Sequence, residues 1–316
     1  PMDADDSHGT HVAGIVAGRN KQTHGVAKEA GIIAARVSSK VGGRTGMFDS
    51  DILAALEWVL AQRAQFDIVA VNLSVGGDQE MIGHCDDLTP YTDIFKLLRA
   101  NNIIPVTAAG NEFHTRGLIV PACVSYGVSV GALTPANQVA DYSNTAPELQ
   151  IMAPGSAIVS SVLPAGFKAL NGTSMAAPHV AGAIAVLAAE YPEANAEQLI
   201  AALGSSSQST LDPRTGRRVP ALHLPSSLNY LQALFTPVPL QPQPSTGNPV
   251  PAEPTKPTPA APAPTPVETA KPAPVKPTPA KPTPAKPAPE KCQERVGGIL
   301  VEKAEKDCKP KEKIDW

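Results

Sequence analysis

Long apolar runs, aromatic side chains and cysteines are all scarce in this chain of 316 residues. Aromatic residues make up 4% of the sequence, and only 4 residues are cysteine. No run of about eighteen or more apolar residues occurs, so the sequence gives no support for a membrane-spanning helix. It also shows no recognisable signal peptide, and the first residue is Pro1 rather than methionine.

An excess of positive charge is also lacking in the first part of the chain. Before Pro237 there are 14 lysines and arginines against 20 aspartates and glutamates, a net charge of −6, and the remainder has 12 against 9, or +3. A surface that binds nucleic acid is normally basic. This balance therefore argues against nucleic acid as a partner of the first part.

Proline is the residue whose distribution divides the chain. Of the 34 prolines, 20 fall between Pro237 and Pro289, in repeated units such as Lys-Pro-Thr-Pro-Ala. Such a tract cannot bury a core and favours polyproline II, with a reach on the order of 170 Å at about 3.1 Å per residue. We expect a globular domain over residues 1–235, a disordered Pro-rich linker over 236–291 and a short cysteine-containing segment over 292–316. The tail would be a spacer, and attachment to the cell envelope is one candidate role.

Limited digestion tests this division of the chain. A protease is expected to cut first between Thr236 and Lys291, because an extended tract without a core is the most accessible substrate. The remaining core should keep its thermal stability, measured by melting after mass spectrometry has identified the fragments. A drop in stability on trimming would mean that the tail packs on the domain.

Two alternating hydrophobic patterns predict an α/β fold. Helical periodicity occurs at Asp51–Arg63, Tyr91–Ala100, Met175–Glu190, Ala196–Leu203 and Leu228–Leu234. Short apolar runs typical of buried strands occur at Ile32–Val37, Ile68–Leu73, Ile103–Ala108 and Val124–Val130. Strands that are apolar throughout and separated by helices predict a mostly parallel sheet covered on both faces, a three-layer α/β/α arrangement. Chemistry is then expected at the carboxyl ends of the strands.

Two short motifs hold residues capable of chemistry. The stretch SHGTHVAG places His8 and His11 three residues apart at the start of an apolar helical pattern. This pair fits metal ligands, structural imidazoles or one catalytic base beside a bystander, although a zinc site would need further ligands that no other histidine supplies at a suitable spacing. Ser174 stands where a glycine-rich turn becomes an apolar helix. That position fits either a helix N-cap or a nucleophile with an exposed hydroxyl.

A series of blocks resembles the subtilisin-like serine endopeptidases, in that family's order and spacing. The blocks are SHGTHVAG from Ser7, NLSVGG from Asn72, AAGNE from Ala108, VPACVSYGVSVGA from Val120, DYSN from Asp141, MAPG from Met152 and NGTSMAAPHVAG from Asn171. The resemblance covers residues 5 to about 235. It implies a subtilisin-like fold and a serine-type endopeptidase (EC 3.4.21.-) that acts on proteins or peptides and needs no cofactor for its chemistry.

The resemblance assigns catalytic roles to His8, Ser174 and Asn111. A serine hydroxyl is a poor nucleophile at neutral pH, so Ser174 would need His8 as the general base that takes its proton. His11 would be the bystander packed behind His8. The oxyanion formed by attack would be bound by the side-chain amide of Asn111 and the backbone N–H of Ser174.

The resemblance also implies how a substrate binds. An extended peptide would lie between two edge segments and pair with them backbone to backbone. The residues involved would be Gly46, Met47, Phe48, Ser74, Val75, Gly76, Ala109 and Gly110. Ile119 would border the pocket for the residue before the scissile bond, where many relatives carry glycine. We therefore expect a preference for smaller apolar side chains at that position.

One departure from the family's pattern concerns the third member of the catalytic triad. In the family, an aspartate at the end of the first core strand, within an Asp-x-Gly sequence, orients the histidine. No such segment occurs in this chain, where Asp3, Asp5 and Asp6 precede His8 directly. We expect residues 1–316 to be a fragment of a longer precursor, with the aspartate outside it and little activity alone. The alternative is a catalytically inactive peptide-binding or scaffold protein that keeps the fold.

Calcium and disulfides are the remaining expectations. The loop Gly18–Gly25 contains Arg19 but no carboxylate, so the calcium site that many relatives have there is not expected. Other structural calcium sites are left open. Some secreted members of the family pair a cysteine placed like Cys123 with an upstream one, here Cys85, while Cys292 and Cys308 flank the terminal segment. Two disulfides would fit a secreted or cell-envelope protein, and free buried thiols remain open for the first pair.

Overall fold

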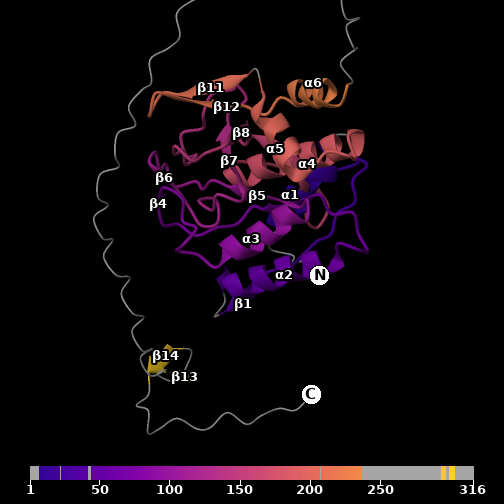
Figure 1. Ribbon diagram of the computed structural model, residues 1–316. Helices are drawn as coiled ribbons and strands as arrows, with labels where there is room; N and C mark the ends of the chain where they lie inside the picture. Colours follow the sequence, from indigo (N-terminus) through magenta and orange to yellow (C-terminus); the bar gives the residue numbers. More distant parts are fainter. Residues whose placement is uncertain are drawn as a thin grey trace, which may run out of the picture. The chain divides into compact units, whose positions relative to one another are not determined.

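The computed structural model describes residues 7–21, 23–41, 44–206, 208–236, 293–296 and 299–302 (Figure 1). The chain divides into two compact units, Pro1–Gln241 and Pro242–Trp316. In the second unit the described part is one antiparallel pair, β13 (Gln293–Val296) with β14 (Ile299–Glu302). The predicted linker beyond Thr236, and Cys292 and Cys308 with it, lie outside the described residues, so the expected domain boundaries stay predictions.

A four-stranded parallel sheet forms the centre of the first unit. Its strands are β3 (Ala70–Leu73), β5 (Ile104–Ala108), β7 (Val128–Leu133) and β8 (Ile151–Pro154), in the spatial order β3-β5-β7-β8. All residues of β5 and β7 are buried. Strands apolar on both faces can exist only between two covering layers. The sheet therefore has the parallel α/β architecture that the sequence predicted.

One face of the sheet packs against α4 (Thr173–Glu190), which contacts all four strands. Alternate strand residues point to this helix because successive side chains of a strand face opposite sides. They include Ile104, Val106, Val128, Val130, Ile151 and Ala153. Beyond α4 lie α1 (His8–Ala17), α5 (Ala196–Gly204) and α6 (Leu224–Phe235). This layer holds the start of α4 at the carboxyl edge of the sheet.

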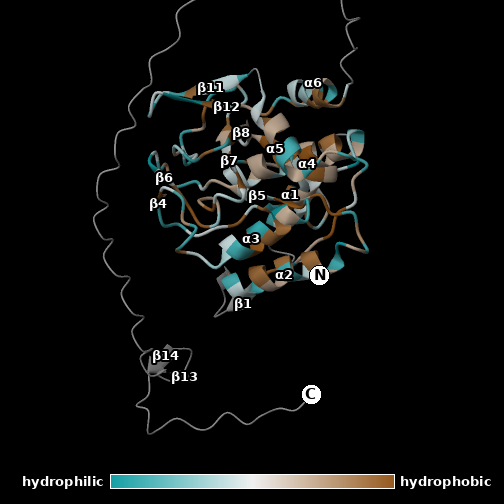
Figure 2. Cartoon of the chain, viewed as in Figure 1, coloured by the Kyte–Doolittle hydropathy of each residue, from teal (hydrophilic) through white to brown (hydrophobic). Residues whose placement is uncertain are grey.

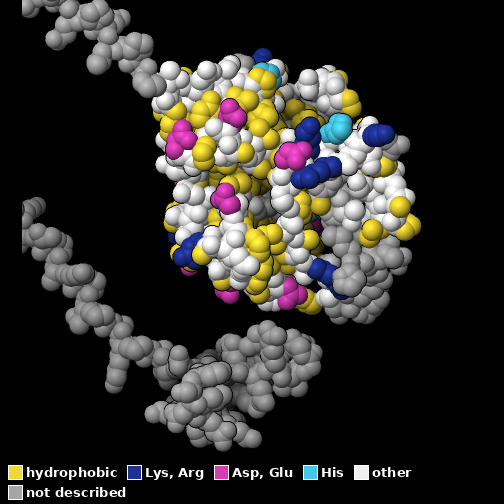
Figure 3. Space-filling model, turned by 90° about the vertical axis from the view of Figure 1, so that its right-hand side faces the viewer, with side chains coloured by type: hydrophobic (Ala, Val, Ile, Leu, Met, Phe, Trp, Pro, Cys, Tyr) yellow, Lys and Arg dark blue, Asp and Glu magenta, His cyan; other side chains and the backbone are white. Residues whose placement is uncertain are grey.

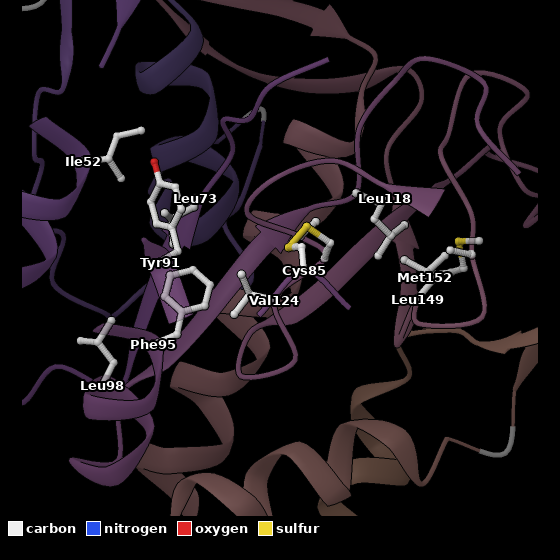
Figure 4. Packing of buried hydrophobic residues seen from close by; sticks show 14 of the residues in the cluster. Ile52, Leu73, Cys85, Tyr91, Phe95, Leu98, Leu118, Val124, Leu149 and Met152 are labelled. Carbon is white, nitrogen blue, oxygen red and sulfur yellow. A yellow bond between two sulfur atoms is a disulfide. The ribbon is translucent and has the colours of Figure 1, made fainter. Parts of the chain in front are cut away.

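The opposite face is covered by α2 (Asp49–Gln62) and α3 (Tyr91–Ala100). Both helices alternate brown and teal in Figure 2, as expected for helices with one buried face. Figure 4 shows the core between them and the sheet, in which Tyr91, Phe95 and Leu98 are at most 1% exposed. The disulfide Cys85–Cys123, which the family resemblance implied, lies in the same core.

In the described part of the first unit, four antiparallel strand pairs lie outside the central sheet. They are β1 (Ser38–Val41) with β2 (Arg44–Met47), β4 (Met81–Ile82) with β6 (Gly117–Leu118), β9 (Ile158–Val162) with β10 (Gly166–Leu170), and β11 (Ser209–Asp212) with β12 (Arg217–Pro220). The apolar runs in the sequence did not predict them, because most of their residues are polar or exposed. Of these pairs, β1–β2 borders the candidate site, through Ser38, Ser39, Gly46 and Met47.

The strand predicted at Ile32–Val37 is wrong. These residues are neither helix nor strand, and all but Val37 are exposed, including Ile32 at 46% and Ile33 at 45%. A strand is defined by backbone pairing with a neighbouring strand, and within the described residues no such pairing involves this segment. The other three predicted strands are confirmed as β3, β5 and β7, although β7 begins later than expected, at Val128.

Candidate active site

A single cavity of about 1170 Å³ brings together the three residues with predicted catalytic roles. His8 comes from the start of α1, Asn111 from the loop after β5, and Ser174 from the start of α4. Their positions are 8, 111 and 174, so only the fold makes them neighbours. The end of the cavity that holds these three residues lies at the carboxyl edge of the sheet, where loops after parallel strands carry functional residues.

Ser174 is the second residue of α4, and a hydrogen-bonded turn sets its position. The first N–H groups of a helix have no carbonyl partner within it, so the N–H of Ser174 is available to an anion. Gly172 just before the helix has φ +150°, a value that side chains disfavour. Its N–H donates to the Tyr142 hydroxyl at 3.1 Å. Burial raises the pKa of Tyr142, which keeps the phenol protonated and able to donate in turn to Gly155.

Ser174 is also joined to the segment that follows β3. Its hydroxyl donates to the carbonyl of Ser74 at 3.3 Å, and the Ser74 hydroxyl donates to the carbonyl of Ser174 at 2.8 Å. Asn72 supports this pair because its amide donates to the Ser74 hydroxyl at 2.9 Å. The nucleophile candidate is thus held against the strand edge along which a peptide would have to lie.

Asn111 is oriented by the residue next to Ser174. Its side-chain oxygen accepts from the backbone N–H of Thr173 at 2.8 Å and from the Thr173 hydroxyl at 3.1 Å. The Thr173 hydroxyl also accepts from the N–H of Gly110 at 3.1 Å. Because the oxygen of the amide is engaged with the helix start, the NH₂ group of Asn111 is left as the donor. Sequence reasoning did not identify Thr173 in this role.

The two histidines of α1 occupy different environments. His8 is half-buried and lines the cavity. His11 is fully buried, and its Nε2 donates to the carbonyl of Lys168 on β10 at 2.9 Å. Ser160 on β9 donates to the carbonyl of His11 at 2.8 Å, which further fixes α1 to this hairpin. His11 therefore packs behind the cavity, as expected of a bystander.

The residues expected to bind substrate differ in whether they line the cavity, lie exposed beside it or are buried behind it. The ones that line the cavity are Gly46, Met47, Ser74, Val75, Gly76 and Gly110. Phe48 is 51% exposed beside them, and Ala109 is fully buried behind Gly110. Ile119, 4% exposed, also lines the cavity, and a Cβ at Gly76 would lie 2.6 Å from its Cδ1. The wall formed by Ile119 and Gly76 is therefore tight.

The cavity continues away from Ser174 into what we call the open strand slot, the space between residues 31–37 and the outer edge of β3. Within the described part of the chain, β3 pairs only with β5, so its other edge has no partner. Apolar side chains line the slot, among them Ile32, Ile33, Trp58 and Phe66, each at least 39% exposed. Figure 3 shows a hollow bordered by hydrophobic side chains on this face.

Neither a metal-binding cluster nor a membrane-spanning helix is found in the described residues. Among them, no three His, Cys, Asp or Glu side chains are grouped so that they could hold a metal ion. No helix within these residues is long and apolar enough to cross a membrane. The expectation that the chemistry needs no metal ion stays a prediction, and structural calcium sites stay open.

The fold and the cavity define a subtilisin-like α/β protein, and comparison with known proteins gives the family. Residues 1–221 match the Subtilase family, and the chain belongs to it. Its resemblance to that family in separate sequence blocks is thereby confirmed. By family and homology it is therefore grouped with the subtilisin-type serine proteases.

Characterised relatives and solved structures agree with this membership. Subtilisin of Bacillus pumilus is 35% identical over 198 residues, which is 61% of this chain and 66% of the relative. Subtilisin E of Bacillus subtilis is also 35% identical, covering 61% of this chain and 48% of the relative. A cold-adapted subtilisin-like serine proteinase is 29% identical, with a TM-score of 0.56 over 69% of this chain and 75% of that one.

A more distant structure shows the same fold. The prenylagaramide maturation protease PagA is 24% identical and has a TM-score of 0.61, covering 72% of this chain and 83% of its own. The present chain spans about half to two thirds of the length of the two subtilisins it matches.

Proposed function

We propose that the full-length protein is a serine endopeptidase that hydrolyses peptide bonds of extended polypeptides through an acyl-enzyme. Ser174 attacks the carbonyl carbon, and His8 takes the hydroxyl proton and later returns it to the leaving amine. The observation that supports this proposal most strongly is the placement of His8, Asn111 and Ser174 along one cavity.

Oxyanion stabilisation is assigned to Asn111 and to the backbone N–H of Ser174. Attack places negative charge on the carbonyl oxygen, and preorganised donors stabilise that charge most effectively. Asn111 fits because Thr173 engages its side-chain oxygen and fixes the direction of its NH₂ group. The helix N-terminus at Ser174 adds a second donor with the favourable end of the helix dipole behind it.

The substrate is proposed to lie as an extended strand along Ser74, Val75 and Gly76, with Gly46, Met47 and Phe48 on its other side. Main-chain pairing reads conformation rather than sequence, so the main selectivity would come from the pocket before the scissile bond. The tight wall of Ile119 against Gly76 supports a preference for small apolar residues there.

The third catalytic group is proposed to be a carboxylate on a strand that occupies the open strand slot. Parallel strands of a sheet end at the same edge. A strand laid beside β3 would therefore end close to Ser74, which already contacts Ser174. Its final residue would be near His8, because His8 and the slot line the same cavity. An aspartate at that position would hold the imidazole tautomer that can accept the serine proton.

An inactive peptide-binding protein with a subtilisin fold is the second candidate. One observation favours it: the 316 residues contain no apolar run that ends in Asp-x-Gly. Such a protein would bind extended peptides in the same cavity without cleaving them. The two candidates are separated by the reactivity of Ser174 toward an active-site probe, because only an activated serine reacts with it.

The cellular compartment in which the protein acts is also a proposal. The buried disulfide Cys85–Cys123 supports an oxidising compartment, and hence a secreted or cell-envelope protein. The Pro-rich sequence after Thr236 would then act as a spacer toward the envelope. No cofactor is proposed for the chemistry, and no structural calcium is assigned to particular residues.

Replacing Asn111 with alanine tests the oxyanion assignment. Turnover of a peptide substrate is expected to fall about a hundred- to a thousandfold, the loss found when the equivalent donor is removed from a subtilisin. KM should change little, because the lost hydrogen bond belongs to the transition state. Steady-state kinetics of the full-length protein give both numbers. A variant that keeps its kcat would remove Asn111 from the mechanism.

A further inference from the structure

We infer that Asn144 and the Asp212–Arg214 pair behind it are positioning residues for the oxyanion donor Asn111. This inference rests on the proposed function and deepens it. None of the three residues lines the cavity. They act through the loop of residues 109–114, which we call the oxyanion loop, by fixing the place from which Asn111 reaches the substrate.

Asn144 is fully buried and makes four side-chain hydrogen bonds, all with the oxyanion loop. Its oxygen accepts from the N–H of Glu112 at 3.0 Å and from the N–H of His114 at 2.9 Å. Its amide donates to the carbonyl of Ala109 at 3.2 Å and to the carboxylate of Glu112 at 2.7 Å. One side chain thus binds the loop on both sides of Asn111.

Glu112 completes this arrangement around Asn111. The carboxylate oxygen that accepts from Asn144 also accepts from the backbone N–H of Asn111 at 2.7 Å. Gly110 allows the approach, because its φ is +108° and a Cβ there would collide with the Asn144 amide and the Glu112 carboxylate. The loop is therefore packed tightly onto Asn144, and a displacement of Asn144 would be transmitted to Asn111.

Asn144 is in turn held from the hairpin β11–β12. The Arg214 guanidinium in the hairpin turn donates to the carbonyls of Asp141 at 2.7 Å and Ser143 at 2.9 Å, just before Asn144. Asp212 accepts from the Thr145 hydroxyl at 2.7 Å, just after Asn144. The hairpin therefore forms hydrogen bonds with the chain on both sides of Asn144.

The Asp212–Arg214 pair joins a buried carboxylate to a guanidinium that is 23% exposed. Arg214 donates through Nε at 3.0 Å and Nη2 at 3.1 Å to the two oxygens of Asp212, which is 1% exposed. Burial raises the pKa of Asp212, but the hydrogen bonds from Arg214 and Thr145 outweigh it and leave the pKa below its ordinary value. The carboxylate thus stays charged at neutral pH and keeps the guanidinium fork in one orientation.

The test is kinetic and uses two variants of the full-length protein, Asn144→Asp and Arg214→Gln. Asn144→Asp keeps the acceptor for the loop N–H groups but places a carboxylate against Glu112. Because misplacement of a catalytic group by about 1 Å can cost about a hundredfold, kcat is expected to fall roughly ten- to a hundredfold for Asn144→Asp and less for Arg214→Gln. KM should stay within about twofold, since the loss concerns the transition state.

A double-mutant cycle separates positioning from general damage. If Asn144 acts through Asn111, then Asn144→Asp should cause no further loss of kcat once Asn111→Ala is present. An equal loss in both backgrounds would mean general structural damage and would overturn the inference. Adding Glu112→Gln to Asn144→Asp should restore much of the activity, because the new amide can donate to the introduced carboxylate.

The matched control is Arg217→Gln. Arg217 lies in the same hairpin and donates to the carbonyls of Ala146 and Pro147, beyond the segment that holds Asn144. This variant should leave kcat unchanged. If it lowers kcat as much as Arg214→Gln, the effect belongs to the hairpin as a whole and the inference is wrong.

Amide hydrogen exchange measures the same positioning without relying on activity. Residues 109–114 should exchange faster in Asn144→Asp and Arg214→Gln than in Arg217→Gln, and unchanged exchange would overturn the inference. If the full-length protein hydrolyses nothing, the proposed function fails, and exchange alone decides whether these residues hold the oxyanion loop.

Discussion

The Ser174→Ala variant of the full-length protein is expected to lose both its reaction with a fluorophosphonate probe and its proteolytic activity. The probe reacts only with a serine whose hydroxyl is activated by a neighbouring base, which separates a nucleophile from an ordinary helix cap. In-gel fluorescence and casein hydrolysis give the two readouts. The loss of turnover should be the largest of any single change in the molecule, since removal of the nucleophile leaves only binding and oxyanion stabilisation.

A matched control for this experiment is Ser74→Ala. Ser74 contacts Ser174 by two hydrogen bonds and lies in the proposed substrate-binding segment, so turnover can fall in this variant, but because Ser74 has no proposed covalent role the variant should keep its labelling. Labelling that persists in Ser174→Ala would refute the nucleophile assignment. A wild-type protein that binds peptides but is not labelled would establish the inactive peptide-binding candidate instead. Activity should also survive a zinc chelator, and loss that zinc alone restores would revive a metal role for His8 and His11.

Residues 1–316 expressed alone are expected to be poorly soluble and almost inactive. The open strand slot leaves the apolar side chains of Ile32, Ile33 and Trp58 open to water beside an unpaired strand edge. Joining an apolar strand that ends in aspartate to the N-terminus should fill the slot and restore both folding and activity. Solubility and thermal melting measure folding, and casein hydrolysis measures activity.

Changing the terminal aspartate of that strand to asparagine provides the control. Folding should be retained, because the two side chains have nearly the same shape. Activity should fall about ten-thousandfold, the loss found when the triad aspartate of a trypsin-like protease becomes asparagine. If purified residues 1–316 are instead well folded and cleave casein as fast as their relatives, one of Asp3, Asp5 and Asp6 serves His8 and the slot needs no further strand.

The sequence predicted most clearly what depends on local pattern. The strands at Ile68–Leu73 and Ile103–Ala108 were found because an apolar run is enough to identify a buried parallel strand. Ile32–Val37 has the same pattern but is no strand, because strand formation depends on a neighbour that no local pattern can show. His8, Asn111 and Ser174 could be selected from their motifs, yet their meeting in one cavity required the fold or the family resemblance.

Sequence patterns did not predict the residues that act on the site from outside the cavity. Asn144 and Arg214 are 70 positions apart and belong to no motif with a chemical meaning of its own. In the sequence, Asn144 belongs only to the block DYSN, which is part of the family resemblance. Their importance comes from hydrogen bonds between segments that only the folded chain brings into contact. Such bonds follow from tertiary structure and have no periodicity to detect.

The hydrogen bonds from the hairpin β11–β12 to the segment around Asn144, which supports the oxyanion loop, have a consequence for the growing chain during synthesis. Synthesis runs from the N-terminus, so His8, Asn111 and Ser174 all exist before Arg214. Until the hairpin has emerged, the carbonyls of Asp141 and Ser143 lack their guanidinium donor and the oxyanion loop lacks its outer support. On the proposed function, a nascent chain would hold a nucleophile and a base beside a weakened oxyanion site, and its proteolytic activity would reach its full value only after the hairpin has been made.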